Sequence, residues 1–175
     1  AFDNKSRERL IWVSRREGFP DWIVKYVKNF VVRRRTKIRL TGYTSDWIKT
    51  EVGIPQGSHL SPILFLFYIS ELIESLQHPE KVHMAFGFVD DTTIVTWSNT
   101  AHKNCRSLEQ AHDKFLVWAK RNGATFAPEK YQLITFTRKR GILSDLNEGI
   151  KIEGAGSSPK TEIKILGILV DKRLK

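Results

Sequence analysis

The sequence predicts an α+β fold in which helices pack on one face of an antiparallel sheet. Apolar residues recur at helical spacing in four segments of the 175-residue chain, and short runs rich in β-branched and aromatic residues lie between them. Several of these runs are close neighbours, which favours hairpins. A hydrophobic content of 41% is typical of a globular protein. We expect a single domain over residues 1–175, because neither a linker nor an internal repeat stands out.

The predicted helices have recognisable starts and ends. Ser6 is a suitable N-cap for the first helix, Gly18 follows its end, and Pro20 opens the second helix. The third helix is apolar almost all round and should be buried on most faces, whereas the fourth is amphipathic and ends before Gly123. The four helices are predicted over residues 6–17, 20–30, 61–76 and 100–122.

The predicted strands are short and alternate apolar with polar residues. Segments 37–40 and 47–52 flank a turn at Gly42 and Tyr43, so we expect them to pair as a hairpin. A Gly- and Ser-rich stretch, 144–160, is expected to be irregular apart from one short strand. The remaining strands are predicted over residues 131–137, 150–152 and 164–170.

Two adjacent aspartates, Asp90 and Asp91, separate two runs of strand-forming residues, 84–89 and 92–97. The pattern predicts a hairpin with both carboxylates at its tip. Mg²⁺ prefers hard oxygen ligands, so such a tip is a candidate metal site. The alternative is an ordinary solvated turn, in which aspartate is common.

The formal net charge of +10 and the pI near 9.8 favour a polyanionic partner, most often nucleic acid. A membrane surface is the weaker alternative, because no basic amphipathic helix with a clean apolar face stands out. A single cysteine, Cys105, excludes an internal disulfide and suits an intracellular setting.

Two basic clusters are candidates for contact with a nucleic-acid backbone, the alternative being solvated charge runs. They are Arg33, Arg34, Arg35, Lys37 and Arg39, and Arg138, Lys139 and Arg140.

The loop before the third helix, Gly53-Ile54-Pro55-Gln56-Gly57-Ser58, contains two glycines and a proline, which impose an unusual backbone path. Glycine lets another molecule approach the backbone, and the amide of Gln56 both donates and accepts hydrogen bonds. The alternative is a plain loop with a helix cap at Ser58 or Ser61.

These segments together resemble the reverse transcriptases of non-LTR (LINE-type) retrotransposons, especially those of fungi. The loop, followed by Leu60-Ser61-Pro62-Ile63-Leu64-Phe65, is similar to motif B, and Phe88-Val89-Asp90-Asp91 is similar to motif C. The likeness covers nearly the whole chain in the family's order. The remaining matches are Ala1-Phe2-Asp3-Asn4 to the end of motif A, residues 123–130 to motif D, and Leu166-Gly167-Ile168 with Asp171 to the primer-supporting segment.

The resemblance implies a right-hand polymerase palm that adds dNTPs to a DNA primer on an RNA template, by two-metal phosphoryl transfer with Mg²⁺ or Mn²⁺. It implies an intracellular location, in the nucleus or in a cytoplasmic ribonucleoprotein. The implied roles fall on six residues of this chain. Asp90 is a direct metal ligand, Asp91 completes the acidic tip, Phe2 excludes a ribose 2′-hydroxyl, Gln56 contacts the nucleotide, Gly57 admits the template base pair, and Lys130 protonates the leaving pyrophosphate.

The sequence also departs from the family pattern. Family members carry a further metal-binding aspartate about four residues before the Ala-Phe-Asp matched here. We therefore expect the motif A strand to be missing, along with complete fingers, thumb and endonuclease, and the fragment alone to be inactive without other parts of its polyprotein. His59 stands where proline is usual. The alternatives are a degenerate transposon remnant that only binds nucleic acid, or an intron maturase-type palm.

Overall fold

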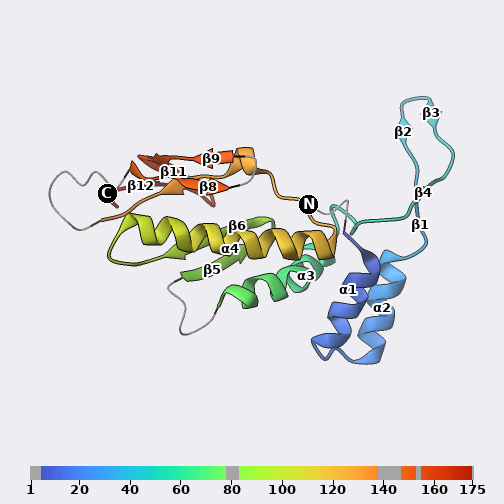
Figure 1. Cartoon of the computed structure of the whole chain (residues 1–175). Helices are drawn as coiled ribbons and strands as arrows, with labels where there is room; N and C mark the ends of the chain where they lie inside the picture. The colour runs from blue at the N-terminus through green and yellow to red at the C-terminus, as the bar shows by residue number, and fades with distance from the viewer. Residues whose placement is uncertain (1–4, 78–82, 138–146, 153–154, 175) are drawn as a thin grey trace. The chain divides into compact units, whose positions relative to one another are not determined.

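The computed structural model describes residues 5–77, 83–137, 147–152 and 155–174, and it contains both helices and short strands (Figure 1). The predicted α+β class is confirmed. The chain forms two compact units. The first comprises Ala1–Ser75, Phe86–Thr92 and Trp118–Ala124, and the second comprises Leu76–Ala85, Thr93–Val117 and Thr125–Lys175. Among the described residues, no helix combines the length and apolar character needed to cross a membrane.

The first unit begins with two helices, α1 (Arg7–Arg16) and α2 (Asp21–Val31), close to their predicted positions. The hydroxyl of Ser6 accepts a hydrogen bond of 3.2 Å from the backbone N–H of Arg9, which confirms the predicted N-cap. Both helices turn an apolar stripe inward, and this stripe forms their core. Its buried residues include Leu10, Val13, Val24, Val27 and Val31.

Helix α3 (Leu60–Leu76) follows the glycine-rich loop, as predicted. Leu64 and Tyr68 are almost completely buried. However, Ile63 and Leu66 are 50% and 45% exposed, so the prediction that most faces are buried is wrong for this side. The described part of the chain packs against one side of α3 and leaves Ile63 and Leu66 open. An apolar sequence pattern predicts that a helix face can be buried, but it does not identify the segment that buries it.

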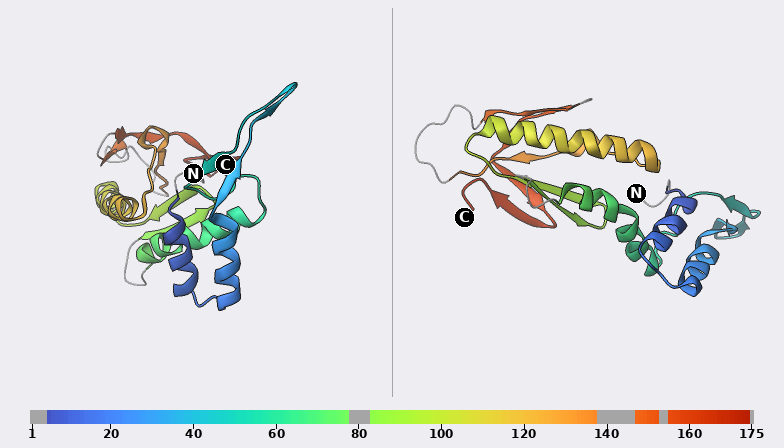
Figure 2. Two further views of the ribbon diagram at one scale, coloured as in Figure 1. Left: turned by 90° about the vertical axis from the view of Figure 1, so that its right-hand side faces the viewer. Right: turned by 60° about the horizontal axis from the view of Figure 1, so that its bottom comes forward.

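A hairpin follows α2, but the predicted pairing of 37–40 with 47–52 is wrong, because the tight turn at Gly42 pairs 39–40 with 43–44 and leaves 48–50 to pair with 34–36. Strand β1 (Arg34–Thr36) pairs with β4 (Ile48–Thr50), and β2 (Arg39–Leu40) pairs with β3 (Tyr43–Thr44). Gly42, at φ +79°, makes the turn at the far end. Figures 1 and 2 show this ribbon extending away from α1 and α2.

The acidic hairpin consists of β5 (His83–Phe88) and β6 (Asp91–Thr96), which pair with each other. Its turn residues are Val89 and Asp90, so the predicted tip is displaced by one residue and Asp91 begins β6. Two-residue hairpin turns require a positive φ, and Val89 supplies it at +50°. A β-branched residue rarely adopts this conformation, which is why the sequence did not indicate the turn.

Gly87 brings the acidic hairpin close to α3. A Cβ atom at this position would lie 3.3 Å from Cδ1 of Ile69 and 3.4 Å from Cδ1 of Ile73. Glycine therefore allows a close strand–helix approach in the first unit.

The second unit contains most of α4 (Ala101–Asn122), the 3₁₀ helix η1 (Pro128–Lys130) and several two-stranded ladders. Strand β7 (Leu133–Ile134) is shorter than predicted and pairs in parallel with β10 (Pro159–Lys160). Antiparallel pairs form between β8 (Ile150–Ile152) and β9 (Ala155–Ser157), and between β11 (Glu162–Ile165) and β12 (Ile168–Asp171).

Two strand predictions need correction. The single strand predicted over 164–170 is a hairpin, because Leu166 and Gly167 have φ values of +48° and +89° and reverse the chain. Across the described residues the strands pair only two at a time, and one pair is parallel. The expected continuous antiparallel sheet is therefore not seen there. Each short strand pairs with one neighbour only, and its other edge has no strand partner among the described residues.

Candidate functional site

Lys5 connects the glycine-rich loop to helix α3 within the first unit. Its carbonyl oxygen accepts a 3.0 Å hydrogen bond from the backbone N–H of Gly53. Its side chain is buried, and Nζ lies 5.6 Å and 5.5 Å from the ring centroids of Phe65 and Tyr68. An ammonium over aromatic rings gains electrostatic stabilisation that offsets part of its lost hydration.

The charge of Asp90 acts on the same lysine. Burial lowers the pKa of Lys5, and the nearby Asp90 carboxylate opposes that shift by raising it. Lys5 thus contacts Gly53 at the start of the loop and the aromatic side of α3, and it lies within electrostatic range of the acidic turn. These three segments, predicted separately from the sequence, come together in the first unit.

Arg7 fixes the start of the loop. Its Nε donates to the carbonyl of Gly53 at 3.2 Å, and Nη2 donates to the carbonyl of Val52 at 2.9 Å. Gly53 is buried and has φ +84°, a conformation that favours glycine. The guanidinium therefore satisfies two backbone acceptors that the unusual turn would otherwise leave unpaired.

The end of the loop is fixed by two serines. The hydroxyl of Ser61 donates to the carbonyl of Pro55, and the hydroxyl of Ser58 accepts from the N–H of Leu60 at 3.3 Å. Ser58 thus bonds to the first residue of α3. Between these anchors Gln56 and Gly57 are exposed. Gly57 has φ +85°, and a Cβ there would meet no atom within 4 Å, so its surroundings are open.

Asp90 and Asp91 are both exposed beside the strained residue Val89. Carboxylate oxygens are suitable ligands for Mg²⁺ or Mn²⁺, so the donor chemistry fits a divalent cation. No group of three or more His, Cys, Asp or Glu side chains suited to a metal was found in the described part of the chain. Two carboxylates do not fill an octahedral shell, and the other oxygens would come from water, substrate or further residues.

Other predicted site residues belong to the second unit or fall outside the described residues. Lys130 is exposed at the end of η1, in the second unit. Phe2 and the basic cluster 138–140 fall outside the described residues. The buried thiol of Cys105 has a pKa raised by burial, with Glu148 and Glu109 adding to the shift, which disfavours a nucleophilic thiolate.

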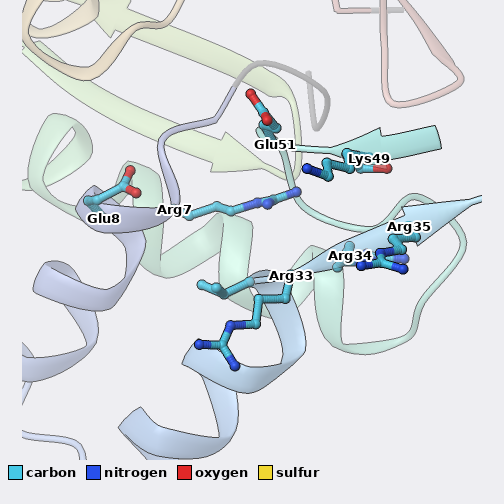
Figure 3. Close-up of a pocket in the computed structure, with 9 residues that line it drawn as sticks. Arg7, Glu8, Arg33, Arg34, Arg35, Lys49 and Glu51 are labelled. Atoms are coloured by element: carbon cyan, nitrogen blue, oxygen red, sulfur yellow. The ribbon is translucent and has the colours of Figure 1, made fainter. Parts of the chain in front are cut away.

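The first basic cluster borders a cavity of about 400 Å³. Arg33, Arg34 and Arg35 contribute to it from the start of the ribbon, and Lys49 contributes from β4. In Figure 3, Arg7 reaches from α1 toward these cations, while Glu8 and Glu51 also border the cavity. Lys37 and Arg39 lie further along the ribbon and do not line it.

The sequence prediction missed Lys5, Arg7 and Lys49. Arg7 was detectable, because it occupies the inward stripe of α1 together with Leu10, Ile11 and Ser14. A charged residue on that stripe needs a buried partner. Lys5 and Lys49 carried no comparable signal, since their roles depend on contacts between segments far apart in the chain.

A family model described as reverse transcriptase (RNA-dependent DNA polymerase) matches residues 1–170 of this chain. The chain belongs to the reverse transcriptase family. The predicted LINE-type relationship is confirmed by its similarity to polymerases of non-LTR retrotransposons from Drosophila melanogaster. The fungal likeness stays a prediction.

Two relatives illustrate this similarity. Over 177 residues, the chain is 27% identical to the RNA-directed DNA polymerase from mobile element jockey. Over 178 residues, it is 29% identical to the probable RNA-directed DNA polymerase from transposon BS. Both alignments cover 99% of this reverse transcriptase chain but only 19% of the relative. No solved structure matches the chain.

Proposed function

We propose that this chain is the palm-type segment of an RNA-directed DNA polymerase that extends a DNA primer with dNTPs on an RNA template. The observation that supports this best is the junction at Lys5. The lysine bonds to Gly53, packs over Phe65 and Tyr68, and lies within the field of Asp90. A nucleotide-binding loop and an acidic turn must be close together for phosphoryl transfer.

Asp90 and Asp91 would hold the divalent cations, with Asp90 as a direct ligand and Asp91 completing the site. Such ions, when bound, stabilise charge on the attacking and leaving oxygens. The strained turn at Val89 supports this assignment, because strain of this kind clusters at functional sites. Lys5 would hold the Asp90 carboxylate in place by charge attraction, and its own burial keeps it from moving freely.

The remaining roles concern the nucleotide. Gln56 would contact the incoming dNTP, and Gly57 would admit the template base pair, consistent with the open space around it. Phe2 would exclude a ribose 2′-hydroxyl. Lys130 would donate a proton to the leaving pyrophosphate, which suits an exposed ammonium.

RNA template and DNA primer are polyanions, and the net charge of +10 is suited to binding them. The cluster from Arg33 to Arg39 would contact their phosphates. We further propose that the chain works inside the cell as part of a longer polyprotein, which supplies the motif A strand and its aspartate. The nucleus or a cytoplasmic ribonucleoprotein would be the setting.

Primer extension tests this function directly. The longest open reading frame that carries this chain should incorporate dNTPs on an RNA template in the presence of Mg²⁺ or Mn²⁺, whereas the 175-residue chain alone should not. Salt-dependent RNA binding by the long form without any template-dependent DNA synthesis would contradict the proposal and favour a degenerate remnant. Robust synthesis by the short chain would show that the additional segments are not needed.

A further inference from the structure

The ribbon that contains β1 to β4 combines positive charge with exposed aromatic rings. Residues 33–51 contain six Arg and Lys side chains and two acidic ones. Tyr43 and Trp47 are each 60% exposed, and both lie in this ribbon. Exposed aromatic rings interleaved with cations are the pattern of surfaces on which unpaired bases stack.

The strand register gathers three cations and one of these rings on a single face. Arg35 lies directly opposite Lys49 in the β1–β4 ladder, so both side chains point to the same face. Lys37 directly follows β1 and Trp47 directly precedes β4, so an alternation continued by one residue predicts both on that face too. The Nζ of Lys37 lies 4.6 Å from the ring centroid of Trp47, which confirms that the two side chains meet.

This arrangement is costly for the free protein. Like charges directly opposite each other destabilise a ladder, and Arg35 and Lys49 are such a pair. The nearby cavity brings in Arg7 and Arg34, and their mutual repulsion helps burial to lower the pKa of Arg7. Glu8 and Glu51 offset only part of this charge. An anionic ligand with regularly spaced charges would relieve the repulsion.

We propose that the Trp47 face, made of Arg35, Lys37, Trp47 and Lys49, binds single-stranded nucleic acid, with a base stacked on Trp47 and phosphates on the cations. This inference rests on the proposed function and specifies which strand the polymerase segment contacts here. A duplex keeps its bases stacked on one another, so it offers phosphates but no ring to Trp47. The ligand is thus an unpaired strand of RNA or DNA.

Binding of labelled oligonucleotides to the 175-residue chain tests the proposal. Short single-stranded RNA, single-stranded DNA and a duplex of the same sequence are compared by fluorescence anisotropy over a range of salt concentrations. Both single strands should bind more tightly than the duplex. Trp47→Ala should weaken single-strand binding about 5- to 100-fold without changing the salt slope, and Trp47→Phe should restore much of it.

Charge substitutions provide the second arm. Lys49→Gln should reduce the salt slope for single strands by about 0.7, the value of one phosphate contact. Trp22→Ala and Lys164→Gln are the matched controls. Trp22 is 70% exposed on α2, Lys164 is exposed on β11, and neither lies on the Trp47 face. Both controls should bind like the unchanged chain.

Two results would overturn the inference. One is equal or tighter binding of the duplex, and the other is unchanged single-strand affinity in Trp47→Ala. Circular dichroism verifies that each variant is folded. If the unchanged long form synthesises DNA normally while the Trp47→Ala variant binds single strands as tightly as the unchanged chain, binding at the Trp47 face is refuted. That combination would leave the proposed function intact. Loss of synthesis in the unchanged long form would refute the function itself.

Discussion

The carbonyl oxygen of Lys5 accepts a 3.0 Å hydrogen bond from the backbone N–H of Gly53. This bond ties the segment before α1 to the loop that precedes α3. The same lysine places its buried ammonium within the field of Asp90, at the turn of the acidic hairpin. A single residue therefore lies between the glycine-rich loop and the acidic turn, the two segments that the proposed function assigns to polymerisation, and its contacts can be tested separately.

The interaction of Lys5 with Asp90 predicts non-additive stability effects. Asp90→Asn should destabilise the chain by about 0.2–1 kcal/mol, the range for exposed ion pairs, because Lys5 loses the charge that offsets its burial. In a Lys5→Met background the same substitution should have no such cost. Urea unfolding of the four variants measures the coupling, and an equal cost in both backgrounds would rule it out.

The lowered pKa of Lys5 also predicts a pH dependence. The unfolded chain holds the Lys5 proton more tightly than the folded chain, so the burial penalty is full below the lowered pKa. The free energy of unfolding should therefore gain a contribution as pH rises toward the ordinary lysine pKa of 10.5. Lys5→Met should remove that gain in urea titrations above neutral pH. An identical alkaline slope in both forms would contradict the assignment.

Arg7 is predicted to stabilise the loop through its two bonds to the carbonyls of Val52 and Gly53. Arg7→Met should lower the free energy of unfolding by about 1.5–3 kcal/mol, because a charged donor to one buried and one part-buried carbonyl is lost. Arg15→Met, at an exposed position on the same helix, is the control and should change it little. Similar losses in both variants would show that helix charge, rather than the loop bonds, is responsible.

The strain at Val89 predicts that stability and function respond in opposite directions. Val89→Gly relieves a left-handed conformation that costs about 1–2 kcal/mol for a residue with a Cβ, although glycine loses more backbone entropy on folding. We expect unchanged or slightly higher thermal stability with slower synthesis, because the Asp90 carboxylate is held less firmly. Val95→Gly, within β6, should instead lower stability. A clear loss of stability in Val89→Gly would contradict the strain argument.

Arg35 and Lys49, the two cations that face each other in the β1–β4 ladder, predict that a substitution can raise stability while it weakens single-strand binding. Lys49→Glu places an acid opposite Arg35 and should raise the free energy of unfolding by about 0.2–1 kcal/mol, while weakening single-strand binding. Thermal unfolding and anisotropy measure the two effects on the same preparation. A variant that is both less stable and equally able to bind would refute the register argument.

The sequence predicted the helices well because capping residues and apolar periodicity are local signals. Ser6 and Gly18 mark the boundaries of α1, and α3 begins within one residue of its predicted start. The turns were less accessible. Val89 and Leu166 adopt positive φ values that their residue types disfavour, so neither turn was placed correctly.

The motif residues of the candidate site were predictable from the sequence, but the residues that contact and position them were not. Asp90, Gln56 and Gly57 stood out because aspartate, glutamine and glycine occur there in a family pattern. Lys5 and Lys49 were missed because burial and cross-strand register, rather than residue type, give them their roles. Contacts between distant segments determine those properties, and periodicity does not report them.

The most direct test of the account is RNA-templated primer extension by the long open reading frame with Asp90→Asn, compared with Asp46→Asn. Asp46 is an exposed aspartate on the ribbon, outside the proposed metal site. Asp90→Asn should lower synthesis at least roughly 100-fold, since metal-stabilised charge is lost, and Asp46→Asn should leave synthesis nearly unchanged. Near-normal synthesis by folded Asp90→Asn would contradict the claim that this carboxylate holds the catalytic ion.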